Sequence, residues 1–454
     1  MAGTFIGGVH PDDSKSLSNT CEIQILPAPA VVVLPVSQHI GAPAKVIVEK
    51  GQKVSIGDIV AEAGGFVSAP IHATVSGTVT AIEPRDTSSG RKILCVVIES
   101  DGEERWADGL NSKQDVSSIS KKEKLDLIRN AGIVGLGGAA FPTHVKLSPP
   151  EDKPIDIVIL NGVECEPYST CDDRLMIEKP GDIVEGLKII MEILDCKKGY
   201  IGIESNKPKA IKSMQEAVKG VDGISVEKLK VKYPQGGEKQ LIYAITKRKV
   251  PAGGLPMDVG CVVQNVGTSV AVFEAVSLKK PLLDRVVTVT GNGVVKPVNV
   301  LARIGDSVET LIEKAGGYSE NAAKLIMGGP MMGPSQFTDE IPVVKGSSCV
   351  LVMNEDEADT GTQLPCISCA RCVDVCPMRL MPSTLGTLVE YEHWDELKDY
   401  GIFDCIECGS CSYICPVKRK LVEYIKFGKA TLMAISAKEK AENVEKNASE
   451  EKPE

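Results

Sequence analysis

Eight of the fifteen cysteines gather in two runs of the same spacing near the C-terminal end of the chain. The runs are Cys366–Pro377 and Cys405–Pro416, and each reads C-x2-C-x2-C-x3-C-P. Thiolates spaced in this way can wrap an iron–sulfur cubane, because two intervening residues let neighbouring cysteines turn toward one metal centre. The spacing therefore predicts two 4Fe–4S clusters, which pass single electrons.

In such paired runs the fourth cysteine of each run binds the cluster of the other run. One cluster is then predicted on Cys366, Cys369, Cys372 and Cys415, and the second on Cys376, Cys405, Cys408 and Cys411. The alternative is two zinc sites built from the CxxC pairs, but zinc sites usually separate their pairs by a longer loop and do not require the C-x3-C-P ending. The seven scattered cysteines are expected to be mostly small buried apolar residues.

A glycine-rich loop, residues 132–146, follows a predicted helix. Gly135, Gly137 and Gly138 let a flat ligand approach the backbone closely. Backbone N–H groups there can cradle a phosphate, and Lys146 adds positive charge. A turn that simply ends a helix would look similar.

Two carboxylates follow the next buried strand, in the turn Asn161-Gly-Val-Glu164-Cys-Glu166-Pro. They could bind ribose hydroxyls or hydrogen-bond a heterocycle, and a solvated turn is the alternative. Two more polar turns come after apolar segments, at residues 233–238 (Tyr-Pro-Gln-Gly-Gly-Glu) and 264–268 (Gln-Asn-Val-Gly-Thr).

The elements around these turns alternate between helix and strand. We expect helices at 124–131, 183–194 and 209–218, and strands at 155–160 and 199–203. This alternation predicts an α/β layer with parallel strands, whose loops bind ligands at the strand ends.

Two further modules flank this layer. Residues 23–97 read as short strands of a lipoyl/biotinyl-type barrel, with Gly64-Gly65 where a carrier would have its lysine, so we expect a scaffold. Residues 286–290 and 298–302 read as a β-hairpin, and 307–314 as a helix. Between the cysteine runs, 383–400 is amphipathic and predicted to be helical, and the Lys/Glu-rich segment 437–454 is predicted to be disordered or a solvated helix.

The composition excludes some classes of protein. The 454 residues carry a net charge of −10, so a nucleic-acid partner is not expected. The most apolar run, residues 30–36, is far shorter than the roughly 20 residues that cross a bilayer. No secretory pattern precedes it, which favours a reducing compartment and metal-binding cysteines.

Together and in this order, the four turns resemble those of the NADH-binding flavoprotein subunit of respiratory complex I and its relatives. In that family they enclose FMN, with NADH stacked on the flavin. The resemblance implies that Phe141, Glu166 and Glu238 lie toward the nucleotide, the two glutamates as catalytic residues. It implies that the flavin is lined by Gly135, Gly137, Gly138, Lys146, Asn161, Glu164, Tyr233, Gly236, Asn265 and Thr268.

The chain departs from that family in two ways. It has two predicted clusters where the complex I subunit has one in this part of the chain. Leu147-Ser-Pro-Pro follows the loop lysine where the family has an aromatic residue, which leaves open the adenine stacking that tight NADH binding needs.

The whole layout resembles the C-subunit family of Rnf electron-transport complexes over about residues 3–430. The strings that carry the resemblance are Gly7–Pro11, Glu164–Pro167, Tyr233–Leu241 and Gly328–Gly333. It implies a multidomain α/β protein in four parts: a barrel at 1–115, an FMN- and NADH-binding α/β domain at 120–282, a β-grasp (SLBB-like) module at 284–345, and a helical ferredoxin domain with two 4Fe–4S clusters at 355–430. The disordered tail at 437–454 is expected from composition alone.

The implied function is that of one member of an ion-translocating ferredoxin:NAD+ oxidoreductase complex, peripheral to the cell membrane on its cytoplasmic side. Electrons would pass between NAD(H), FMN and the clusters, and a flavin is required because a nicotinamide transfers two electrons and a cubane accepts one. The implied partners are integral-membrane flavoproteins and a ferredoxin-like subunit, with coupled Na+ or H+ transport. Two alternatives remain: a soluble reductase that delivers electrons to a corrinoid, and a relay whose α/β fold has lost its flavin.

Overall fold

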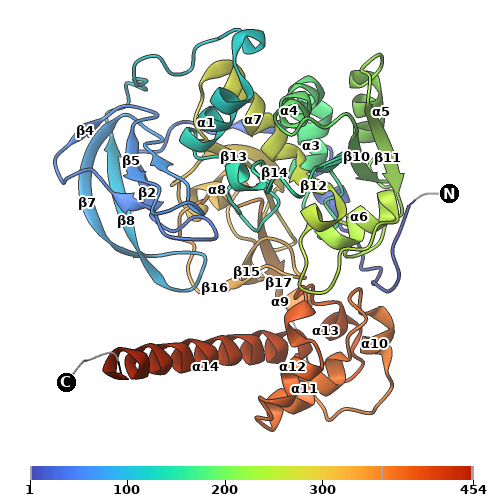
Figure 1. Cartoon of the computed structure of the whole chain (residues 1–454). Helices are drawn as coiled ribbons and strands as arrows, with labels where there is room; N and C mark the ends of the chain where they lie inside the picture. Colours follow the sequence, from blue (N-terminus) through green and yellow to red (C-terminus); the bar gives the residue numbers. More distant parts are fainter. Residues whose placement is uncertain (1–2, 359–360, 451–454) are drawn as a thin grey trace. The chain divides into compact units, whose positions relative to one another are not determined.

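A computed structural model describes residues 3–358 and 361–450, with side chains described as far as residue 442. The described chain forms two compact units (Figure 1). The large unit comprises residues 3–4, 11–231 and 235–358. The small unit comprises residues 5–10, 232–234 and 361–450.

The predicted barrel is present in the large unit as two small sheets, ordered β2-β8-β7-β4 and β3-β5-β6. Gly64 and Gly65 lie between β5 and β6. A Cβ atom on Gly64 would lie 2.0 Å from the Pro43 carbonyl oxygen, so a side chain is sterically excluded there. The strands are β2 Val31–Pro35, β3 Lys45–Val46, β4 Lys53–Val54, β5 Ile59–Glu62, β6 Ile71–His72, β7 Gly77–Asp86 and β8 Lys92–Ser100.

The predicted α/β layer is built on the parallel sheet β11-β10-β9-β12. Its strands are β9 Ile157–Asn161, β10 Gly199–Glu204, β11 Ile224–Leu229 and β12 Cys261–Asn265. Its helices are α1 Lys121–Asn130, α2 Thr143–Lys146, α3 Cys171–Glu178, α4 Pro180–Ile193, α5 Pro208–Ala217, α6 Glu238–Thr246 and α7 Val266–Leu278.

Both faces of this sheet are covered, because alternate side chains of a strand point to opposite faces. Ile157 and Ile159 of β9 share a core with α6. Val158 and Leu160 share a core with α4 and α7. The turns that the sequence predicts to bind ligands are therefore left at the ends of the strands.

The third module is a mixed sheet in the order β1-β14-β13-β17-β15-β16. The predicted hairpin is present as antiparallel β13 Asp284–Thr290 and β14 Val298–Arg303. The predicted helix is α8 Val308–Lys314, and the Ser307 side chain caps it by accepting from Glu309 N. The remaining elements are β15 Ala322–Met327, β16 Ser335–Gln336, β17 Cys349–Asn354 and the short helix α9 Glu355–Ala358.

The first strand lies in a different sheet from the one we expected. β1 Ile23–Ile25 pairs in parallel with residues 299–301 of β14, although the pattern placed Ile23 at the start of the barrel. A short apolar strand can complete any open sheet edge, and its sequence does not say which one. Residues before β2 therefore lie outside the barrel, and some of them contact the α/β layer, as Asp13 O does by accepting from Tyr168 N.

The small unit is helical, and its helices differ from the prediction at residues 383–400. Residues 383–400 form two helices, because the first ends at Glu390 and Glu392 adopts a left-handed φ of 58°. Leu397 of the second helix still packs into the core beside Leu385. The helices are α10 Arg371–Val375, α11 Pro382–Glu390, α12 Glu396–Asp399, α13 Ser410–Ile414 and α14 Leu421–Glu450.

The C-terminal segment was expected to be either disordered or a solvated helix. α14 continues to Glu450, so residues 437–450 take the second of the two forms expected for this segment, a solvated helix, in place of disorder. Its side chains at 437–442 are mostly exposed, and Ala, Lys and Glu are strong helix formers. Residues 451–454 lie outside the described residues. Among the described helices, none combines the length and apolar character that crossing a bilayer requires.

Candidate functional site

The end of the parallel sheet brings two of the predicted turns together. Asn161 ends β9 and Asn265 ends β12, and the two residues are direct partners in the sheet register. Asn265 Nδ2 donates to Asn161 O at 3.4 Å and to Asp172 Oδ2 at 2.7 Å. Asn161 Nδ2 donates to Gly236 O at 2.9 Å, which adds the third turn to the same edge.

The glycine-rich loop is closed on itself and tied to α7. Gly135 N donates to Phe141 O at 2.8 Å, and Leu136 N donates to Thr268 Oγ1 at 2.9 Å. A Cβ atom on Gly137 would lie 3.4 Å from the Asn265 Cβ atom, so the loop passes close to that side chain. Gly138 has a φ of +109°, and no atom lies within 4 Å of the place where its Cβ atom would be. The loop therefore offers bare backbone to open space at Gly138.

Lys146 and Glu238, predicted to serve different ligands, form an ion pair. Lys146 Nζ donates to Glu238 Oε1 at 2.6 Å and to Val263 O at 2.9 Å. Their side chains remain 28% and 38% exposed. A partly exposed pair costs little to open, so both groups can turn to a bound ligand.

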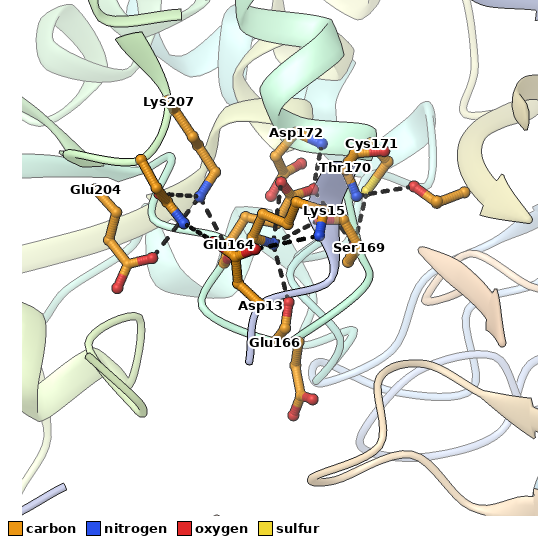
Figure 2. A network of polar contacts seen from close by, with 12 residues as sticks. Asp13, Lys15, Glu164, Glu166, Ser169, Thr170, Cys171, Asp172, Glu204 and Lys207 are labelled. Atoms are coloured by element: carbon orange, nitrogen blue, oxygen red, sulfur yellow. Dashed lines mark hydrogen bonds and ion pairs between the residues drawn. The ribbon is translucent and has the colours of Figure 1, made fainter. Parts of the chain in front are cut away.

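Glu164 is enclosed, with a side chain only 4% exposed, and Figure 2 shows its contacts. Its Oε1 atom accepts from Asp172 N at 2.8 Å and from Ser169 Oγ at 3.3 Å. Its Oε2 atom lies 3.8 Å from Lys15 Nζ and has no hydrogen-bond partner among the described residues. Burial raises the pKa of Glu164, and the Lys15 ammonium group opposes that shift.

Glu166 lies on a different surface of the same turn. Its Oε2 atom accepts from Met331 N at 3.2 Å, in the connection between β15 and β16. A Cβ atom on Gly329 would lie 2.3 Å from that oxygen, so the glycine makes room for the carboxylate. The Gly328–Gly333 string is thus part of the surroundings of Glu166.

Tyr233 belongs to the small unit, unlike the other predicted flavin residues. Its hydroxyl donates to Cys408 O at 2.8 Å, and its main chain pairs with that of Val9. The structure therefore gives the side chain a contact with a cluster-binding segment. Its place beside a flavin stays a prediction.

The small unit contains an internal repeat. Each cysteine of the second run follows its counterpart by 39 residues, as Cys405 follows Cys366. Left-handed residues recur at the same interval, at Ser368 and Glu407, Ala370 and Gly409, and Arg379 and Lys418. Backbone N–H groups point at equivalent sulfurs, from Ser368 to Cys366 (3.4 Å), Glu407 to Cys405 (3.3 Å), Leu380 to Cys376 (3.3 Å) and Arg419 to Cys415 (3.4 Å).

One cavity of the small unit is lined by Cys376, Cys405, Cys408 and Cys411. These are the cysteines predicted to bind the second cluster, given that the fourth cysteine of each run binds the cluster of the other run. No three His, Cys, Asp or Glu side chains of the described residues are close enough to hold a single metal ion. Sulfurs spread around a cavity fit a cubane, whose ligands bind separate iron atoms, better than a zinc ion.

The other cysteines divide by exposure. Cys366 and Cys369, assigned to the first cluster, are exposed, Cys372 is buried and Cys415 is half-buried. Five of the seven scattered cysteines are buried, as predicted: Cys95, Cys171, Cys196, Cys261 and Cys349. Cys21 and Cys165 are half-buried.

The sheet edge fits FMN in its donor set. Gly138 leaves open space against bare backbone, and Lys146 supplies a cation for a phosphate. The Glu164 Oε2 atom, without a hydrogen-bond donor among the described residues, is a buried acceptor that a ligand N–H or hydroxyl group would satisfy. Gly138 and Lys146 were expected from the sequence in the glycine-rich loop, and Glu164 in the turn after the next strand.

Three residues of this site were missed by the sequence reasoning. Lys15 and Lys207 hold the Glu164 turn, and Asp172 binds Asn265. Lys15 lies just after the Gly7–Pro11 string, which was the available signal for a constrained N-terminal segment. Asp172 lies in the first turn of α3 and Lys207 just before α5, and neither stands in a motif that the sequence marks.

Four families match successive parts of the chain. They are the RnfC barrel sandwich hybrid domain at residues 3–103, the Nuo51 FMN-binding domain at 128–274, the SLBB domain at 286–335 and the 4Fe-4S dicluster domain at 365–419. The four matches agree with the predicted order of barrel, flavin fold, β-grasp module and ferredoxin domain.

Two relatives match nearly the whole chain. The C subunit of the proton-translocating ferredoxin:NAD(+) oxidoreductase complex of Clostridium ljungdahlii is 48% identical over 97% of this chain and 96% of its own length. The C subunit of the Na(+)-translocating ferredoxin:NAD(+) oxidoreductase complex of Acetobacterium woodii is 44% identical over 95% and 98%. A solved NAD+-reducing [NiFe]-hydrogenase chain gives a TM-score of 0.48 at 18% identity, over 63% of this chain and 55% of that chain.

Proposed function

The chain belongs to the family of C subunits of ferredoxin:NAD(+) oxidoreductase complexes, and we propose that it is the subunit at which such a complex reacts with NAD(H). It joins an FMN-binding domain and a two-cluster domain in one polypeptide. Bound FMN takes electrons from a nicotinamide in pairs and releases them singly, and 4Fe–4S clusters carry them one at a time.

The observation that carries this proposal is the convergence of the turns at the carboxyl edge of the parallel sheet. Asn161 and Asn265 are paired in register, Gly236 accepts from Asn161, and Thr268 holds the glycine-rich loop. In open α/β sheets this edge is where ligands bind. A scaffold without a ligand would not need four polar turns and a bare glycine at one edge.

We assign roles to the residues of this edge on that basis. Gly135, Gly137 and Gly138 would lie against the flavin, and Lys146 would neutralise its phosphate. Asn161, Glu164, Gly236, Asn265 and Thr268 would complete the flavin site, with Tyr233 as a further predicted member. Phe141, Glu166 and Glu238 would face the nucleotide, where the two carboxylates orient it by accepting hydrogen bonds.

We further propose the setting of the subunit. Its partners would be integral-membrane flavoproteins and a ferredoxin-like subunit, which would hold it peripherally on the cytoplasmic side of the cell membrane. The complex would couple electron transfer to transport of Na+ or H+. The names of the two relatives, one for each ion, support both possibilities.

The test is an anaerobic titration of the FMN-loaded, cluster-reconstituted protein with NADH, followed by visible absorbance. The expected result is bleaching of the flavin band together with the broad cluster absorbance. If flavin and clusters are verifiably present and neither bleaches, NADH is not the donor and the proposal fails. Tight binding of cobalamin by the same preparation would favour the corrinoid reductase instead.

A further inference from the structure

The N-terminal segment that precedes the barrel packs along the turn that carries Glu164 and Glu166. Tyr168 N donates to Asp13 O at 2.8 Å, and the Ser18 and Thr170 hydroxyl groups share a hydrogen bond of 2.8 Å. Lys15 lies between these two contacts. Residues 13–18 therefore belong structurally to the candidate flavin site, although they are far from it in sequence.

The Lys15 side chain contacts three residues of the turn. Its Nζ atom donates to Ser169 O at 2.6 Å and to Glu166 O at 3.0 Å, and it lies 3.8 Å from Glu164 Oε2 (Figure 2). The residue is only 5% exposed. A lysine is rarely buried to this extent unless its charge is compensated, and here the Glu164 carboxylate and two carbonyl groups compensate it.

A second buried lysine holds the other end of the turn. Lys207 Nζ donates to Val163 O at 2.7 Å and to Glu164 O at 3.4 Å, and its carboxylate partner is Glu204 at 3.7 Å. The two lysines thus stabilise different parts of the turn. Lys207 contacts Glu164 only through its backbone, whereas Lys15 faces its carboxylate. Figure 2 shows both ammonium groups directed at the turn.

The turn needs such support because its backbone is strained. Glu164 has a φ of 47° and Tyr168 a φ of 69°, both in the left-handed region that residues with a Cβ atom disfavour. Strained turns persist where surrounding contacts hold them, and they are frequent at ligand sites.

We propose that Lys15 is a positioning residue of the flavin site, which fixes the Glu164 carboxylate and the turn around it so that the N-terminal segment completes the site. This inference rests on the proposed function, because it assumes that the Glu164 turn faces FMN. It predicts that Lys15 acts through Glu164 and not only through the fold.

The test compares Lys15→Met, Glu164→Gln and the double variant with the wild-type full chain, all carrying reconstituted clusters. FMN affinity is measured by fluorescence titration, and the flavin midpoint potential by redox titration. Lys15→Met is expected to weaken FMN binding at least tenfold and to shift the potential. In the Glu164→Gln background the same change should have little further effect, since coupled residues are not additive.

The pH profile gives a readout that a purely structural lysine would not change. Burial raises the pKa of Glu164 and the Asp172 carboxylate adds to that shift, whereas the Lys15 and Lys207 ammonium groups oppose it. Removal of Lys15 should therefore leave the carboxyl group protonated to higher pH. FMN affinity of Lys15→Met should therefore change with pH on the alkaline side of the wild-type profile, and this dependence should vanish in the double variant.

Lys212→Met is the matched control, because that lysine side chain is 80% exposed on α5 and should behave as wild type. If wild-type protein binds no FMN, the proposed function fails. If it binds FMN and Lys15→Met binds equally well with the same potential, the inference is overturned. Should Lys15→Met fail to fold, as judged by cluster signals and circular dichroism, Glu164→Gln decides, because unchanged FMN affinity and potential there would also overturn it.

Discussion

At the scale of single residues, the two acids of the Glu164-Cys-Glu166 turn have opposite surroundings. Glu164 is enclosed with Lys15 and hydrogen-bonded to Asp172 N, and its position is fixed. Glu166 accepts from Met331 N and borders Gly329. These surroundings suit the roles proposed for them, Glu164 beside the flavin and Glu166 toward the exchanging nucleotide.

Gly329→Ala tests the role of Glu166 without removing its carboxylate. The new Cβ atom would lie 2.3 Å from Glu166 Oε2, so the side chain must move. We expect the KM for NADH to rise about fivefold with FMN content unchanged, and stability to fall by about 1–3 kcal/mol from overpacking. Steady-state NADH:ferricyanide assays and thermal unfolding measure these effects.

Gly181→Ala provides the control for this substitution. It lies in α4, and no atom is within 4 Å of the place where its Cβ atom would be. It should leave both KM and stability near wild type, since Ala is the better helix former. An unchanged KM in Gly329→Ala would mean that the position of Glu166 does not influence the nucleotide.

The residues that the sequence revealed were those attached to strand ends. Asn161 and Asn265 could be placed together because parallel strands end at one edge. Lys15 could not, because its contact with Glu164 joins residues that no local pattern relates. A side chain that reaches a site from a segment outside the module cannot be predicted when each module's sequence is analysed by itself.

At the scale of elements, the glycine-rich loop is the part of the site most sensitive to a side chain. Gly138→Val would place a β-branched residue at a φ of +109° and fill the open space beside the loop. We expect FMN affinity to fall at least tenfold while cluster absorbance and EPR signals stay intact. Flavin release on denaturation and EPR of the same sample measure both.

Gly90→Val separates backbone strain from a filled site. Gly90 has a φ of +72° in the hairpin between β7 and β8, with no atom within 4 Å of its Cβ position. It should lose some stability and keep its FMN. Retention of FMN by Gly138→Val would remove the loop from the flavin site, and loss of both cofactors would show that the two units do not hold them independently.

Elements with strong periodicity were predicted well, and those decided by tertiary contacts were not. The helices expected at 124–131, 183–194 and 209–218 and the strands expected at 155–160 and 199–203 are present as α1, α4, α5, β9 and β10. β1 joined the β14 edge because pairing there is a matter of position, and residues 383–400 broke into two helices at Glu392. Residues 437–450 are helical despite having little to bury, which their Lys- and Glu-rich composition allows.

At the scale of the whole molecule, the small unit joins two copies of one cysteine-bearing motif. The interval of 39 residues relates the cysteines, the left-handed residues and the N–H groups directed at sulfur. N–H contacts to cluster sulfurs tune the reduction potential, so the repeat gives both clusters the same pattern of such contacts. The two sites differ in exposure, because Cys366 and Cys369 of the first are exposed and Cys376, Cys408 and Cys411 of the second are buried. The two halves cannot act separately, because each is predicted to supply one ligand to the other's cluster.

This exchange of ligands gives the last prediction. Cys376 lies in the first run but lines the cavity of Cys405, Cys408 and Cys411. Cys376→Ala should therefore abolish the same EPR signal as Cys405→Ala, whereas Cys372→Ala and Cys415→Ala should abolish the other. Alanine is used because it cannot ligate iron. All four variants should keep FMN and its bleaching by NADH, because the flavin residues at the sheet edge belong to the large unit. If Cys376→Ala instead loses the signal that Cys372→Ala loses, each run binds its own cluster, and the motif is a pair of independent sites.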